Sequence, residues 1–237
     1  MVRENRFFNQ KLRFYQPKSH RLSIVEILFC DFIKAPKAQP NLADLGAGFG
    51  TLSMLCSLKL KCKVLAVEND PLMIELLYKN IEINSLGEFI KVAEFDIKDP
   101  KSWCERGAFD CVVCNPPFFR WGKNLYRSET KTVLSDFINC AGFVLRDGGF
   151  LNLMIPAFRL FEAYEYMKIN NIHPKVIRFL YPKVGFPAKV VFILGVKNIK
   201  PEVFFEKPLI INKDDGEYTN EVLSCIQGFC DIIEGLG

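Results

Sequence analysis

The sequence has no long hydrophobic run. Nowhere in its 237 residues do about eighteen apolar residues follow one another without interruption, which excludes a membrane-spanning helix. The first residues, Met1 to Arg6, lead into polar sequence and offer no apolar core of a secretion signal. We therefore expect a soluble, cytoplasmic protein that does not bind a membrane.

Histidine is equally scarce. The only two are His20 and His173, too few to favour a zinc site. There are nine cysteines, and Cys111 and Cys114 have the spacing of a redox or metal-binding pair. Both fall in a predicted strand, however, where positions three apart face opposite sides of the sheet. We expect no metal, and we expect the cysteines to stay reduced as small buried hydrophobes.

Acidic residues are almost missing from the first 21 residues, which hold six basic side chains against Glu4 alone. The rest of the chain has 25 basic and 26 acidic residues, so the net charge of +4 comes from this N-terminal arm. Aromatic residues lie among the cations of the arm: Phe7, Phe8, Phe14 and Tyr15. Such an arm suits a phosphate backbone and stacked bases, and the alternative is an ordinary solvated surface.

The remaining chain alternates β-type and helical patterns. Strands are predicted at 41–45, 63–67, 89–94, 109–114 and 150–155, and helices at 22–33, 51–60, 70–84, 132–145, 159–169 and 219–233. Two further β-rich runs, 175–180 and 189–196, predict antiparallel strands at one edge, and 208–211 a short extended piece. The alternation predicts an α/β fold with a doubly wound, mostly parallel sheet. We divide the chain into 1–34, the basic arm with a helix that covers a sheet edge, and 35–237, the main domain.

A glycine-rich turn follows the first strand of that domain. Gly46, Gly48 and Gly50 stand between a strand and a helix, which is how nucleotide-like cofactors are held. The usual dinucleotide fingerprint needs a glycine at the position of Thr51. The spacing therefore weakens an NAD or FAD assignment.

Acidic residues stand at the tips of the next two strands. Glu68 is placed to accept the hydroxyls of a ribose, whereas Asp70, before Pro71, reads as a helix N-cap. Asp96 lies beyond the third strand, where it would accept from an adenine amino group or simply close a turn.

The fourth strand ends on Asn115, Pro116, Pro117 and Phe118. Each proline removes a backbone donor and restricts the residue before it, so this segment is rigid. The Asn115 side-chain oxygen and the Pro116 carbonyl can together accept both hydrogens of a planar NH₂ group, while Phe118 stacks on its ring. The alternative is a plain proline turn. All these polar features fall at carboxyl ends of strands, where doubly wound sheets bind ligands.

Together these motifs resemble those of Rossmann-like, class I S-adenosylmethionine-dependent methyltransferases that modify amino groups. The resemblance implies that Asp44, Gly46 and Gly48 line the methionine end of S-adenosylmethionine, that Glu68 binds its ribose and that Asp96 faces its adenine. It also implies that Asn115 lies next to the cofactor.

More specifically, the chain resembles the bacterial tRNA adenine-N6 methyltransferases that modify tRNA1(Val) next to the anticodon. The similarity extends over most of the chain, through segments that include 16–18, 127–129, 156–159 and 216–219. Ser128 replaces the histidine that members commonly carry, and the turn 182–187 retains part of the usual pattern. As tRNA-binding candidates the resemblance and the charge favour Arg13, Lys18, Arg21 and Arg127.

Other acceptors share the chemistry of a planar NH₂ group. Guanine N2 in ribosomal RNA and a glutamine amide in a protein fit the motif at Asn115 as well as adenine N6 does. The basic arm favours RNA over protein. A catalytically inactive RNA-binding relative is the alternative of another class, against which the complete glycine turn and proline motif argue.

Overall fold

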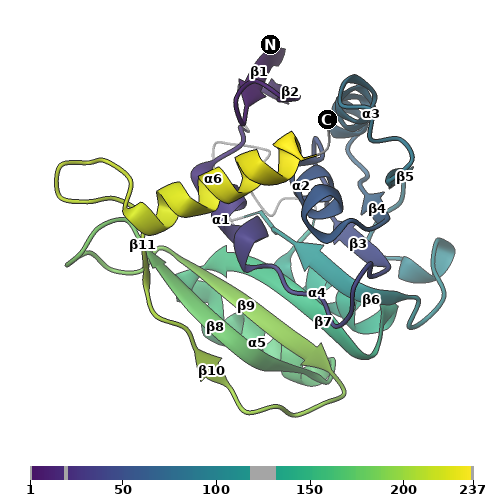
Figure 1. Cartoon of the computed structure of the whole chain (residues 1–237). Coiled ribbons are helices and arrows are strands. Elements are labelled where there is room, and N and C mark those ends of the chain that lie inside the picture. Colours follow the sequence, from purple (N-terminus) through teal and green to yellow (C-terminus); the bar gives the residue numbers. More distant parts are fainter. Residues whose placement is uncertain (1, 19–20, 118–131, 236–237) are drawn as a thin grey trace.

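The computed structural model describes residues 2–18, 21–117 and 132–235. A two-stranded hairpin precedes a nine-stranded sheet, which helices cover on both faces (Figure 1). The strands are β1 (Val2–Phe7), β2 (Leu12–Pro17), β3 (Leu42–Leu45), β4 (Val64–Val67), β5 (Ile90–Ala93), β6 (Phe109–Cys114), β7 (Leu145–Pro156), β8 (Ile172–Tyr181), β9 (Val190–Lys197), β10 (Phe204–Phe205) and β11 (Leu209–Ile210). The helices are α1 (Ile24–Phe32), α2 (Thr51–Leu60), α3 (Pro71–Ile83), α4 (Leu134–Val144), α5 (Leu160–Ile169) and α6 (Asn220–Glu234), with 3-10 turns η1 (Pro100–Ser102) and η2 (Ala157–Arg159). Among these described helices, none is both long and apolar enough to cross a membrane.

The strand order in the sheet is β10-β8-β9-β7-β6-β3-β4-β5, and β11 also pairs with β8. The expected doubly wound sheet is confirmed, because β6 and β4 flank β3 and all three run parallel. The expected antiparallel pair near one edge is also present as β8 and β9. Since β9 is antiparallel to β7 as well, β8 runs in the direction of the parallel strands. Strand β8 can run in this direction because α5 carries the chain back to the other end of the sheet before β8 begins.

Two hydrophobic layers enclose the sheet. Cys111 and Val113 of β6 belong to the layer under α1, α2, α3 and α6, whereas Val112 and Cys114 belong to the layer under α4 and α5. Cys111 and Cys114 therefore face opposite sides, as the strand period predicts. The expectation that the first helix covers a sheet edge is wrong, because the Phe29 ring of α1 lies 5.1 Å from that of Phe192 on the interior strand β9.

The N-terminal arm forms the hairpin of β1 and β2, which docks on α3. Two of its four aromatic residues, Phe8 and Phe14, are not available for the expected base stacking. Phe14 is fully buried and Phe8 nearly so, both within the main hydrophobic core. The Tyr15 ring is covered on one face by the Lys79 ammonium, 3.7 Å from its centroid. Along β2 the buried Leu12, Phe14 and Gln16 alternate with half-buried residues, so Phe14 faces inward where the hairpin packs on the domain.

Candidate active site

Four parallel strands end side by side. Leu45 of β3 pairs with Val67 of β4 and with Cys114 of β6, and Val67 pairs with Ala93 of β5. The residues that follow these four ends therefore form a row along one rim of the sheet. Gly46, Glu68 and Asn115 stand in this row, so the structure brings together three of the residues that the sequence predicts for the site.

The glycine turn approaches the tip of β4. The amides of Gly46 and Ala47 both donate to the Val67 carbonyl, at 2.9 and 3.0 Å. Gly46 and Gly48 have φ of +71° and +57°, a region that favours glycine. A Cβ at Gly46 would lie 2.8 Å from the Phe137 ring of α4, whereas a Cβ at Gly48 would enter open space. Gly48 thus leaves open space beside its backbone, where a ligand could approach closely.

The third glycine has a different role. Gly50 is the N-cap of α2 with φ +97°, and a Cβ there would lie 2.5 Å from Cδ1 of Leu77. It therefore permits close packing of α2 against α3.

Glu68 is tied to the loops around it. One of its oxygens accepts from the Gly48 amide at 2.8 Å, and the other accepts from the amides of Asn69 and Asp70. A carboxylate offers about four acceptor positions, so one remains for a further donor. Asp70 caps α3 through the amides of Leu72 and Met73, which confirms its predicted structural role.

Asp44 lies under the turn and is 1% exposed. Ser53 of α2 donates to its Oδ2 at 2.6 Å, and its Oδ1 has no hydrogen-bond partner in the described part of the chain. Burial raises the pKa of Asp44 to about 7 against the effect of the Ser53 hydrogen bond, and the Glu68 charge adds to the rise. The sequence offered little to identify Ser53, because a serine in an apolar helix carries no distinct pattern.

Asn115 resembles Asp44 in the hydrogen bonding of its side-chain oxygen. Its Oδ1 is buried without a hydrogen-bond partner among the residues described, and the buried Pro116 follows it. Leaving a buried polar atom unpaired costs about 1–3 kcal/mol, so such atoms in native structures point to a function or a missing ligand. Phe118 and Arg127, predicted for the target base and for tRNA, lie outside the described residues.

The other predicted residues have ordinary surroundings. Asp96 accepts from the Lys98 amide at 2.9 Å and pairs with the Lys98 ammonium at 3.6 Å, as a turn acid does. Arg13 donates to the Ile83 carbonyl at 3.1 Å. Lys18 and Arg21 are exposed on the segment after β2. The structure therefore leaves the roles of these four residues as predictions.

S-adenosylmethionine, implied by the resemblance, fits these observations. Within the described chain four buried side-chain atoms lack a partner, and two of them are Asp44 Oδ1 and Asn115 Oδ1. Both are acceptors, as the ammonium, hydroxyl and amino groups of a nucleoside-like ligand require. Gly48 provides the open approach beside them.

A cavity of about 430 Å³ lies elsewhere, between α4, the end of α5 and the segment from Ile97 to Arg106. Lys98, Arg106 and Lys197 contribute to its lining, but none of the predicted site residues does. It is therefore separate from the rim that carries Asp44 and Asn115.

Comparisons with known proteins agree with this geometry. Two similar relatives are named tRNA1(Val) (adenine(37)-N6)-methyltransferase. The one from Shewanella sediminis is 26% identical over 80% of this chain and 84% of its own length, and the one from Haemophilus influenzae is 25% identical over 80% and 82%. A crystal structure of a predicted O-methyltransferase from Agrobacterium tumefaciens superposes with a TM-score of 0.72 at 21% identity, covering 86% of this chain and 96% of that one. The model of the methyltransferase small domain matches residues 25–170, and the chain belongs to that family.

Proposed function

We propose that the protein transfers a methyl group from S-adenosylmethionine to the N6 amino group of an adenine in tRNA, in the cytoplasm. The observation that carries this proposal is the buried Oδ1 of Asn115, which has no hydrogen-bond partner among the described residues and follows the β6 position in register with the end of β3. The names of the relatives support adenine N6 and tRNA as the acceptor. The proposed target is adenine 37 of tRNA1(Val), which those names specify.

Asn115 and Pro116 act on the acceptor nitrogen. The amino nitrogen of adenine shares its lone pair with the ring, which makes it a weak nucleophile. Acceptance of its two hydrogens by Asn115 Oδ1 and the Pro116 carbonyl favours the pyramidal form, which can attack, so this contact is stronger in the transition state than in the ground state. Pro117 holds the segment rigid, and Phe118 receives the face of the extruded base.

Asp44, Gly46, Gly48, Glu68 and Asp96 hold the cofactor. When bound, S-adenosylmethionine supplies an electrophilic methyl group on a sulfonium. Asp44 Oδ1 offers a negative charge toward the cationic methionine end, and Gly48 allows that end to approach the backbone. Glu68 has an acceptor position left for a ribose hydroxyl. The chain's residues thus align acceptor and donor on one rim, and this alignment supplies much of the rate.

The proposal is tested by incubating the protein with tRNA that lacks modifications and with labelled S-adenosylmethionine, and then identifying the methylated nucleoside. N6-methyladenosine is expected. N2-methylguanosine in ribosomal RNA, or label in a glutamine amide of a release factor, would replace the proposed acceptor with one of the two others. Cofactor binding without transfer to any of these would indicate an inactive RNA-binding relative.

Variants at Asn115 test the mechanism. Asn115→Ala should lower kcat about 100-fold or more, while the dissociation constant of S-adenosylmethionine, measured by calorimetry, changes by less than about threefold. Asn115→Asp keeps an acceptor oxygen and should retain more activity than the alanine variant. Methylation by Asn115→Ala at the wild-type rate would remove this side chain from the mechanism.

A further inference from the structure

Two phenylalanine rings stand almost fully in solvent at the start of α5. Phe158 of η2 is 79% exposed and Phe161 of α5 is 81% exposed. They are three positions apart around a helical turn, a spacing that places side chains on the same side. Neither ring contributes appreciably to the core, and neighbouring exposed apolar side chains of this size mark interaction surfaces.

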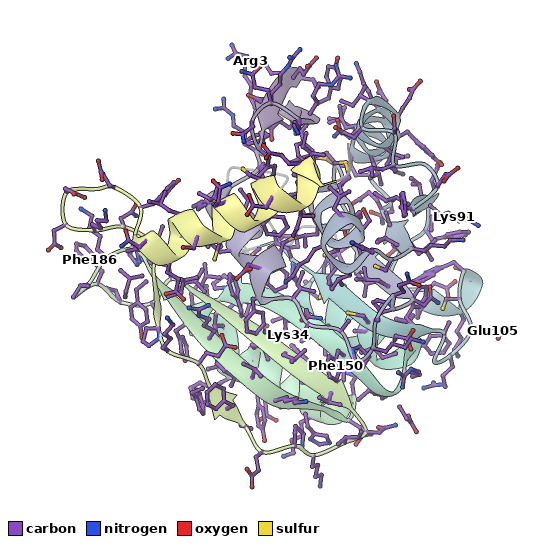
Figure 2. The ribbon with its side chains drawn as sticks, in the orientation of Figure 1. Arg3, Lys34, Lys91, Glu105, Phe150 and Phe186 are labelled. Atoms are coloured by element: carbon purple, nitrogen blue, oxygen red, sulfur yellow. The ribbon has the colours of Figure 1, made fainter. Side chains whose placement is uncertain are left out.

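These rings lie on the same rim as Asn115. Leu153 of β7 pairs with Cys114 of β6, and β7 continues three residues further to Pro156, directly before η2. The Ala157 amide donates to the Lys189 carbonyl at 3.0 Å, which places the β8–β9 loop next to η2. That loop carries Phe186, 57% exposed, at the left margin of the molecule in Figure 2.

An ion pair stabilises the turn that carries the two rings. Arg159 is 2% exposed and donates from Nε and an NH2 group to both oxygens of Glu162, each at 3.0 Å. A bidentate pair of this kind fixes both partners in orientation. The turn that carries the two phenylalanines is therefore held in a fixed orientation.

The strand order indicates what this surface binds. The cofactor residues follow β3, β4 and β5 on one side of Asn115, so the acceptor must enter from the other side, over the ends of β7, β9 and β8. There the protein offers aromatic rings, and the exposed Lys189 lies next to η2. Rings interleaved with cations are the combination that binds single-stranded nucleic acid.

We infer that Phe158 and Phe161 form a stacking surface for unpaired bases that flank the methylated adenine. This inference rests on the proposed function and names how the RNA is positioned. It assigns to these rings the binding of substrate, so their removal should raise KM and leave kcat nearly unchanged.

The test uses the full-length protein and an anticodon stem-loop RNA with 2-aminopurine next to the target adenine. Wild-type protein should quench the 2-aminopurine fluorescence as the base stacks. Phe158→Ala/Phe161→Ala should lose this quenching. Each ring that is removed should raise KM about tenfold or more, and kcat should stay within about twofold of wild type. The pair Phe204→Ala/Phe205→Ala removes two other exposed rings, 63% and 61% exposed, from β10 at the edge of the sheet and should behave as wild type.

Leucine and tryptophan variants separate stacking from general apolar contact. Phe158→Leu/Phe161→Leu should fail like the alanine pair, whereas Phe158→Trp/Phe161→Trp should restore quenching. An unchanged KM in the alanine pair of an RNA-methylating protein would overturn the inference and leave the proposed function intact. So would self-association of the wild type in sedimentation that the alanine pair abolishes, since the rings would then join two copies. Absence of methylation of any RNA by the wild type would reject the proposed function itself.

Discussion

Asp44 carries a buried carboxyl group whose two oxygens have different surroundings. Oδ2 accepts from Ser53, and Oδ1 faces no partner in the described structure. Burial raises the pKa of Asp44 to about 7, so near neutrality a large share of the ligand-free protein holds it protonated. A cationic ligand beside Oδ1 favours the ionised form, and the protein must release this proton to bind such a ligand.

S-adenosylmethionine should therefore bind more tightly as the pH rises through about 7. Because only the ionised form of Asp44 attracts the cation, the association constant should increase about tenfold between pH ~6 and pH ~8. Calorimetry in buffers of different ionisation enthalpy would show the affinity and the released proton together.

Two variants control this experiment. Asp44→Asn should bind more weakly and lose the pH dependence. Ser53→Ala removes the hydrogen bond that lowers the pKa of Asp44, so the rise in affinity should move to higher pH. An affinity that stays flat from pH ~6 to pH ~8 in the wild type would mean that Asp44 is already ionised or does not face the ligand.

Strand β2 is paired along one edge with β1 and held on α3 by side chains. Asn80 accepts from the Tyr15 amide at 2.6 Å and donates to the Tyr15 carbonyl, and Asn84, one helical turn on, does the same with Arg13. Asn80 also donates to the Phe49 carbonyl in the glycine turn, at 2.9 Å. The N-terminal hairpin and the glycine turn thus share one buried amide.

Asn80→Ala should destabilise the protein by about 3 kcal/mol, because three backbone groups, one buried and two part-buried, each lose a hydrogen bond at once. Urea unfolding measures the loss, and limited proteolysis should cut the hairpin first. Gln227→Ala removes an exposed helical amide that pairs only with Asp231 among the described contacts, and should cost no more than about 0.5 kcal/mol. Equal stability of the two variants would show that the hairpin is not held by Asn80.

Prediction from sequence succeeded where a pattern is local. The bounds of α2 and β6 coincide with the predicted 51–60 and 109–114. A glycine lies at or shortly before the start of each element, and the ends are marked by a lysine after α2 and by the Asn-Pro-Pro segment after β6. The hairpin was missed although Leu12, Phe14 and Gln16 alternate with outward residues along β2. The cations between them made the segment read as an arm, and its burial depends on α3, far along the chain.

The same difference between local and long-range patterns applies to the candidate site. Glu68 and Asn115 were predictable because in-register parallel strands bring their ends together wherever the strands themselves are recognised. Ser53 and Phe137 were not, since their contacts with Asp44 and Gly46 arise only when α2 and α4 pack on the sheet. The ring pair of Phe158 and Phe161 was missed because exposure of an aromatic residue has no local signature.

Over the whole molecule, the residues at the two rims of the sheet have different roles. The carboxyl ends of the strands carry the proposed site, and Asp110, near the amino end of β6, joins three segments at the opposite rim. It accepts from the Asn41 amide before β3 at 2.9 Å, and it pairs with Arg146 of β7 at 2.6 Å and with Lys37 at 2.8 Å. Burial alone would raise the pKa of Asp110, but the hydrogen bonds from Lys37, Arg146 and Asn41 lower it to about 2.

Asp110 should stabilise the fold at neutral pH and lose this effect in acid. Its pKa is lower in the folded protein than the usual 3.8, so the contribution is complete well above pH ~4 and declines as the pH falls through about 2. The difference corresponds to about 2 kcal/mol. In urea unfolding, Asp110→Asn should lose this amount at pH ~7 and about half of it near pH ~3, whereas Glu88→Gln, at an exposed carboxylate, should match the wild type at both. A loss that is the same at every pH would assign the role of Asp110 to shape rather than charge, because only the ionised form can pair with Lys37 and Arg146.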